Sequence, residues 1–228
     1  MSDKKTLPPG QKASEIFPRF GLPQYADRFP TDPNIIRFSV GGEIEEFEIS
    51  EQLKSLSRID QVSDFHCVTT WSALNLNWSG YRFSDFYNTL ILPHVEADIS
   101  FVILKAQDGY KTSLPLADLM HENVLLADQL YDKPLSIEHG APLRIIAPDH
   151  YGYKNLKHLK RLEFYSEIKS VKQGYLSFMD HPRARVAKEE RATKGPGILF
   201  RYLYRLGIKG TIKKFNQEML VYKNEKSE

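Results

Sequence analysis

The strongest constraint on the fold is a series of short apolar strands, separated by turn residues, between residues 34 and 165. "IIRFSVGGEIEEFEIS" alternates apolar and polar residues on both sides of two glycines, which predicts a hairpin that turns at 41–42. "ISFVILKAQDGYKTSLPL" predicts a second strand pair that turns at 108–109. No glycine-rich phosphate loop joins a strand to a helix. The sequence therefore predicts an α+β fold with a mixed sheet rather than a doubly wound α/β fold.

Short helices are expected between these strands. Ser50 is the expected N-cap of a helix over 50–59, and Ser84 is the expected N-cap of a helix over 82–92. A basic helix is expected within 152–161. Backbone N–H groups at such a helix start, beside basic side chains, form a site for a phosphate, but the same residues also suit a solvated surface helix. Spacing alone leaves both interpretations open.

Composition divides the chain into three parts. Residues 1–16 are polar and are expected to form a flexible leader, residues 17–182 form the main domain, and residues 183–228 form a basic extension. Between residues 183 and 214 there are ten Lys or Arg and two acidic residues, although the whole chain has a net charge of only +2. "ILFRYLYRLG" (198–207) predicts an amphipathic helix. Such a helix either docks a partner or an anionic membrane, or packs its leucines on the body and leaves its arginines in solvent.

The single cysteine, Cys67, lies in "DFHCVTTWSALNLNWSG" at the expected end of a strand. One cysteine excludes an internal disulfide, a Cys-based zinc finger and a CxxC redox pair. Taken alone, it is a buried core thiol, a nucleophile or a metal ligand. The histidines are scattered without the spacing of a zinc or iron site, and a hydrolase that pairs Cys67 with His139 or His150 stays open. The sequence has no apolar run typical of a signal peptide or a membrane span, which predicts a cytoplasmic location.

Several motifs occur in an order that resembles a known family. They are "FHCVTTWS", a W-x-G, "DGYKTSLPL", "NVLLADQL", "PLSIEHGAPLRIIAPDHYGYKNLKHLKRLEF" and "DHPRARVAKEER". The series resembles the molybdopterin-binding domain of the sulfite oxidase family over roughly residues 30–190. It is most similar to the small haem-free members and to the molybdenum subunit of the bacterial protein-methionine-sulfoxide reductases.

The resemblance implies a mixed-sheet α+β fold of the sulfite oxidase type over residues 17–182, which binds one molybdopterin, with a basic helical tail after it. It makes Cys67 the catalytic residue and the only protein ligand of the molybdenum. The implied cofactor-binding residues are Arg19, His139, Arg144, Asn155, Leu156 and Lys157. A soft thiolate suits molybdenum held by dithiolene sulfurs, and the basic loop suits the pterin phosphate. Thr69 stands where the reductase has a glutamate near the metal.

The function that the resemblance implies is oxygen-atom transfer to or from a small or sulfur-containing substrate. Because no haem domain is encoded, we expect no haem and a separate electron-transfer partner. No nucleic-acid partner is expected, and peripheral membrane contact through residues 195–214 is one interpretation of the tail. Two alternatives from other classes remain: a hydrolase or transferase that uses Cys67, and a non-catalytic binding module on the same fold.

Overall fold

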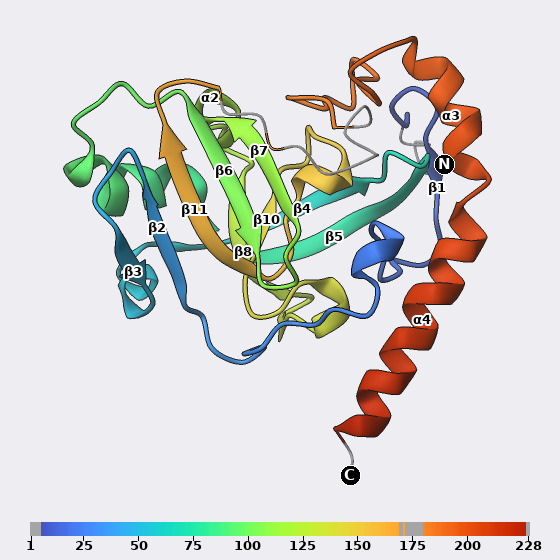
Figure 1. Ribbon diagram of the computed structural model, residues 1–228, viewed down its shortest axis with the longest axis horizontal. Helices are drawn as coiled ribbons and strands as arrows, with labels where there is room; N and C mark the ends of the chain where they lie inside the picture. Colours follow the sequence, from blue (N-terminus) through green and yellow to red (C-terminus); the bar gives the residue numbers. More distant parts are fainter. Residues whose placement is uncertain (1–5, 169–170, 172–179, 227–228) are drawn as a thin grey trace, which may run out of the picture.

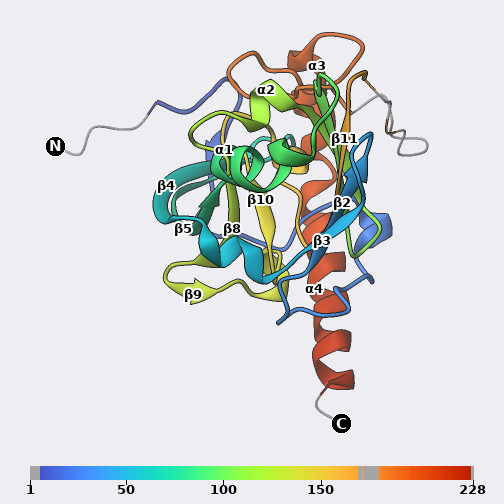
Figure 2. The same cartoon turned by 90° about the vertical axis from the view of Figure 1, so that its left-hand side faces the viewer.

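The computed structural model describes residues 6–168, 171 and 180–226, and it contains two β-sheets that pack against each other (Figures 1 and 2). One sheet has the order β1-β5-β8-β10, with β4 paired to β5 and β9 paired to β8; the other has the order β3-β2-β11-β6-β7. The first contains β1 (Lys12–Ala13), β4 (Arg58–His66), β5 (Trp71–Arg82), β8 (Leu125–Leu130), β9 (Lys133–Pro134) and β10 (Arg144–Ile146). The second contains β2 (Phe38–Gly42), β3 (Phe47–Ile49), β6 (Phe101–Ala106), β7 (Lys111–Pro115) and β11 (Leu159–Tyr165).

Both sheets are mixed, as the sequence predicted. β1 runs parallel to β5 and β2 runs parallel to β11, while the other pairs are antiparallel. The helices are α1 (Phe83–Phe86), α2 (Leu116–Leu119), α3 (Gly197–Arg205) and α4 (Ile208–Glu225). The last two form a continuous edge of the molecule beside the N-terminal segment (Figure 1). This is the α+β arrangement that the strand pattern predicted.

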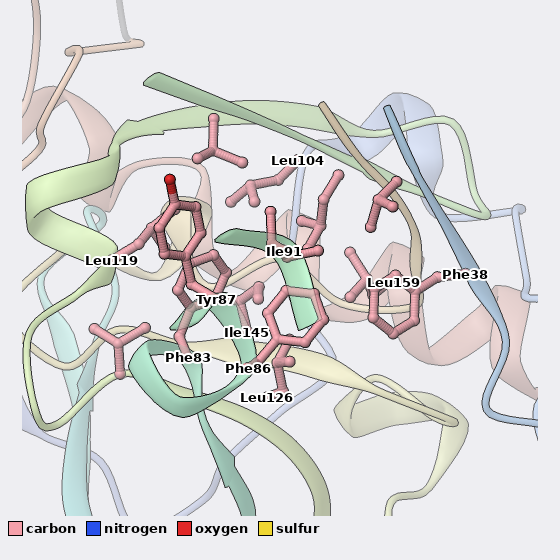
Figure 3. Packing of buried hydrophobic residues seen from close by; sticks show 14 of the residues in the cluster. Phe38, Phe83, Phe86, Tyr87, Ile91, Leu104, Leu119, Leu126, Ile145 and Leu159 are labelled. Atoms are coloured by element: carbon pink, nitrogen blue, oxygen red, sulfur yellow. The ribbon is translucent and has the colours of Figure 1, made fainter. Parts of the chain in front are cut away.

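The main core lies between the two sheets. Figure 3 shows Phe38 of β2 and Leu104 of β6 facing Leu126 of β8 and Ile145 of β10, with Phe86 of α1 between them. All of these side chains are almost fully buried. Full burial of an apolar side chain of this size contributes about 1.5–3 kcal/mol, so this cluster joins the two sheets into one body.

The first glycine pair has a different role from the predicted turn. Gly41 and Gly42 lie inside β2, and the chain reverses over residues 43–46. Gly42 has a φ of +100°, and a Cβ on it would lie 2.4 Å from the carbonyl oxygen of Phe164. The glycine therefore allows β11 to approach β2 closely. The second predicted turn is confirmed, with Gly109 at a φ of +89° between β6 and β7.

The two helices expected over 50–59 and 82–92 have different outcomes. The 50–59 segment is a 3₁₀ turn over Glu51–Ser55 that Ser50 does not cap with its side chain, and β4 begins at Arg58. The helix expected over 82–92 does form, because α1 continues without a break into a π-helical turn over Tyr87–Ile91 and a 3₁₀ turn over Leu92–His94. Ser84 is not its N-cap, since the helix begins one residue earlier. The helix expected over 50–59 is shorter than predicted because the chain joins β4, which pairs with β5 from Arg58 onward.

The expected basic helix is a single 3₁₀ turn over Gly152–Lys154, and β11 starts five residues later. Lys154 is fully buried and donates to the Ser113 carbonyl (3.0 Å) and to Asp180 (2.9 Å), so it is not free for an anion. Neither a solvated helix nor a helical phosphate site forms here. The segment continues as strand because its leucines and phenylalanine complete the core.

Residues 11–14, which belong to the expected flexible leader, pair with the first sheet. The N–H groups of Lys12 and Ser14 donate to the carbonyls of Thr70 (2.9 Å) and Ser72 (2.8 Å), which places β1 beside β5. Gln11 is buried and donates to the Cys67 carbonyl at 3.1 Å. A polar segment is fixed here because β5 offers it an unpaired strand edge.

Candidate functional site

A cavity of about 350 Å³ opens between the end of the first sheet and the C-terminal helices. Its walls come from residues 17–25, from the turn that carries Cys67, from residues 138–158 and from residues 203–215. The cavity brings together six of the residues that the family resemblance singled out: Arg19, Cys67, Arg144, Asn155, Leu156 and Lys157. Residues that are far apart in sequence therefore meet at one site.

Cys67 is the first residue of the turn that joins β4 to β5, just past the strand end, as predicted. Its N–H donates to the Trp71 carbonyl (2.8 Å), and its own carbonyl accepts from the N–H of Thr70 (3.0 Å). Thr70 has a φ of +83°, a left-handed conformation that is uncommon for threonine. The turn fixes the position of the Cys67 side chain in the cavity wall.

The Cys67 sulfur has one hydrogen bond among the described contacts, to the Thr69 hydroxyl at 3.1 Å. Burial raises the pKa of the thiol, and the bond to Thr69 opposes this rise. No described histidine bonds to the sulfur. His150 instead bonds to the Arg183 carbonyl, and the ring of His139 stacks on Phe17 at 4.6 Å. The arrangement lacks the Cys–His pair that a hydrolase needs.

Arg144 supplies a buried positive charge to the cavity. Its Nη atoms donate to the carbonyls of His139 (2.7 Å) and Asn155 (3.3 Å), and its guanidinium lies 5.0 Å from the ring of Trp78. Within the described chain its Nε has no hydrogen-bond partner and no carboxylate pairs with it. Burial lowers the pKa of Arg144 to about 9, because no nearby negative charge of the described residues compensates the buried guanidinium. An anionic ligand in the cavity would stabilise this positive charge.

Lys157 and Arg19 add further positive charge. Lys157 donates to the Glu138 carbonyl (3.2 Å), and burial, with the nearby charges of Arg144 and Arg19, lowers the pKa of Lys157 to about 7. Arg19 is almost fully buried and donates to the carbonyls of Ala26 and Arg28 at 2.8 and 2.9 Å. Clustered cations of this kind suit a phosphate-bearing ligand.

Asn155 and Leu156 line the cavity, but their side chains make contacts that stabilise the fold. The Asn155 amide accepts from the N–H of Ala147 (2.8 Å) and donates to its carbonyl (3.1 Å). Leu156 belongs to the main core. The asparagine therefore fixes the loop whose carbonyl holds Arg144.

His139 is not among the residues that line the cavity, but its ring stacks on Phe17, which does line it. Burial lowers its pKa to about 4, and its Nδ1 has no partner among the described residues. His158 lines the cavity and escaped the sequence analysis. Its Nδ1 bonds to the Ala141 carbonyl (2.6 Å), and burial lowers its pKa to about 3, which keeps the ring neutral. Its φ of +54° has no signal in the sequence.

Two arginines of the C-terminal extension also escaped prediction at this site. Arg191 is fully buried and donates to the carbonyls of Val68 and Pro9. Arg205 donates to the hydroxyl of Thr70 at 2.9 Å. The extension thus holds the turn that carries Cys67. The basic composition of the segment was visible, but these partners were not.

These features define a class of protein: a mixed-sheet domain with one thiol and a cluster of cations around a single cavity. The family model described as "Oxidoreductase molybdopterin binding domain" matches residues 26–172. The chain belongs to this family and is a molybdopterin-dependent oxidoreductase of the sulfite oxidase type, as the motifs indicated.

Similar proteins agree with this assignment. The chain is 33% identical over 164 residues to the uncharacterized oxidoreductase YuiH of Bacillus subtilis, covering 71% of this chain and 80% of that protein. It is 27% identical over 188 residues to the catalytic subunit MsrP of the protein-methionine-sulfoxide reductase of Xanthomonas axonopodis pv. citri, covering 71% of this chain and 58% of MsrP. The sulfane dehydrogenase SoxCD of Paracoccus pantotrophus has the same fold, with a TM-score of 0.53 and 18% identity over 65% of this chain and 43% of the SoxCD chain.

The residues in the cavity fit a molybdenum–molybdopterin cofactor. Arg144 offers positive charge with an unpartnered Nε, Lys157 adds a second cation although Asp108 and Glu138 also line the cavity, and Cys67 offers a soft sulfur at the wall. The described residues contain no group of three or more His, Cys, Asp or Glu side chains that could hold a metal ion by themselves. A metal at Cys67 would therefore take most of its ligands from an organic group, as a dithiolene pterin provides.

Proposed function

We propose that this protein catalyses oxygen-atom transfer to or from a small sulfur-containing substrate at a molybdenum bound through Cys67. The observation that carries the proposal is the position of this cysteine, in the wall of the same cavity as Arg144 and Lys157. When bound, the cofactor supplies the two-electron redox change and the transferable oxygen. The protein supplies position, charge and exclusion of water.

Each residue has a role in this proposal. Arg144 and Lys157 bind the pterin phosphate by charge-assisted hydrogen bonds, and Arg19 adds a third cation. The Thr69 hydroxyl donates a hydrogen bond to the Cys67 thiolate and lowers the electron density on its sulfur. Aromatic side chains line the cavity near the sulfur and keep water away from it: Phe17, Phe20, Phe65 and Trp71.

The substrate and partner rest on similarity to relatives. MsrP is named as the catalytic subunit of a methionine-sulfoxide reductase, which favours a sulfoxide-type substrate here too. MsrP is named as one subunit of its reductase, and a further relative is also named as a reductase subunit, which supports a separate electron-transfer protein here. A cytoplasmic location, the absence of haem and the absence of a nucleic-acid partner remain predictions.

The test is elemental and pterin analysis of protein purified from a host that makes the cofactor. We expect about one molybdenum and one pterin per chain in the wild type. Cys67→Ser should lose most of the molybdenum, while Arg144→Met should lose the pterin as well. Ser63→Ala, which changes a hydroxyl in β4 away from the cavity, is the matched control and should keep both. Wild-type protein without molybdenum would contradict the proposal.

A further inference from the structure

The outward face of α3 is apolar. Five large side chains on this helix and just after it are 54–84% exposed: Ile198, Leu199, Tyr202, Leu203 and Leu206. Soluble proteins rarely expose so many large apolar side chains together without a binding role. Of the two interpretations of this helix, the one in which its leucines pack on the body does not agree with their exposure.

The face of α3 that meets the body is polar instead. Arg201 pairs with Glu189 through two bonds of 2.8 Å, and Arg205 donates to the Thr70 hydroxyl. Tyr204 is buried and donates to the Arg191 carbonyl at 3.2 Å. The helix is inverted relative to an ordinary amphipathic helix, because its charges bind the body and its leucines face solvent.

The sequence around this face carries only positive charge. No acidic residue occurs from 191 to 217, and Lys194, Lys209, Lys213 and Lys214 are exposed. Leucine, isoleucine and tyrosine flanked by lysines match a lipid surface with anionic headgroups, in which the apolar side chains enter the acyl boundary and the lysines meet phosphates. Charges of a single sign from residue 191 to residue 217 are expected for binding to an anionic lipid surface, whereas binding to a water-soluble protein would not require them.

We propose that residues 194–214 bind the surface of an anionic lipid bilayer, with Leu199 and Leu206 inserted. The contact is peripheral, since no helix of the described chain is long and apolar enough to cross a membrane. Leu203 both belongs to this face and lines the cavity, so the bound protein holds its active-site cavity next to the bilayer. The proposal depends on exposed side chains and not on the chemistry at Cys67.

The test is co-sedimentation of the full-length holoprotein with phosphatidylcholine vesicles, with and without phosphatidylglycerol. We expect binding only when phosphatidylglycerol is present. Leu199→Ser with Leu206→Ser should weaken it by roughly tenfold for each leucine. Lys209→Glu with Lys213→Glu should weaken it by at least about fivefold for each lysine.

Leu220→Ser with Val221→Ser is the matched control, because these α4 residues are similarly apolar and 63% and 51% exposed. The control should bind like the wild type, and all variants should keep the wild-type molybdenum content. Absence of wild-type binding, or equal losses in the control and in the Leu199/Leu206 variant, would overturn the proposal. A wild-type dimer that the Leu199/Leu206 variant abolishes would overturn it too, because the face would then join two copies.

Discussion

Replacement of Arg191 by methionine tests whether the C-terminal extension holds the Cys67 turn. Arg191 is fully buried, and its two Nη atoms donate to the carbonyls of Val68, next to the cysteine, and Pro9, in the N-terminal segment. Its Nε donates to Glu189 at 3.1 Å. One guanidinium therefore joins three parts of the chain.

The structure gives the magnitude of the effect. Methionine fills most of the volume, so the cavity left behind is small. The two carbonyls lose a charged donor at a partly buried position, which costs about 1–2.5 kcal/mol each. Glu189 keeps its two bonds to Arg201 and is not left unpaired. We expect the free energy of unfolding to fall by about 2–5 kcal/mol, a large part of the usual 5–15 kcal/mol.

Urea unfolding of the cofactor-free protein measures this loss as a lower midpoint at an unchanged slope. Arg37→Met is the matched control, because the Arg37 side chain is 63% exposed and pairs only with exposed Glu48. The control should change stability by less than about 0.5 kcal/mol. If Arg191→Met cost no more than the control, the extension would not stabilise the metal-ligand turn.

Three further predictions concern the cavity and the sheet. Since the pKa of Lys157 is about 7, the lysine is protonated at lower pH and neutral at higher pH. The affinity of the cofactor-free protein for sulfate should therefore fall roughly tenfold from about pH 6 to about pH 8. Lys157→Met should abolish this change in a calorimetric titration, and a similar change in the variant would contradict the prediction. Gly152→Ala places a Cβ 2.2 Å from the Phe65 ring, so we expect lower molybdenum occupancy by elemental analysis, and full occupancy would show that the ring moves freely. Gly80→Ala places a Cβ 2.1 Å from a carbonyl of β8 and should lower the free energy of unfolding in urea by about 1–3 kcal/mol. Gly210→Ala, whose Cβ would have no atom within 4 Å, should raise it by about 0.5–1 kcal/mol. Equal effects of the two variants would refute the steric argument.

Much of the fold could be predicted from the sequence, because strand periodicity and turns are local signals. The 108–109 turn and the mixed sheets followed from them. The extent of the 82–92 helix was also predictable, but the N-caps were not, because neither Ser50 nor Ser84 caps a helix with its side chain. The length of the 50–59 helix depended on where β4 begins to pair with β5, which no local pattern contains. The position of Gly42 depended on how closely β11 approaches, which no local pattern contains.

At the candidate site, the sequence predicted only residues that the family resemblance singled out. Cys67 and Arg144 were named through the family resemblance, and both line the cavity. Arg191 and Arg205 could not be found, because their partners are backbone carbonyls and a hydroxyl far away in sequence. The orientation of α3 could not be predicted for the same reason. The face of a helix that packs inward depends on its partners, and here the body presents oxygen atoms that bind the arginines of α3.

The last wall of the cavity has a consequence for how the protein acquires its cofactor. The last five lining residues in the chain come from α3, α4 and the turn between them: Leu203, Tyr204, Gly207, Thr211 and Phe215. During synthesis on the ribosome, the Cys67 turn and the cation cluster therefore emerge well before the segment that covers them. A molybdopterin that binds during this interval meets a cavity that lacks this wall, whereas in the folded protein α3 and α4 already line it.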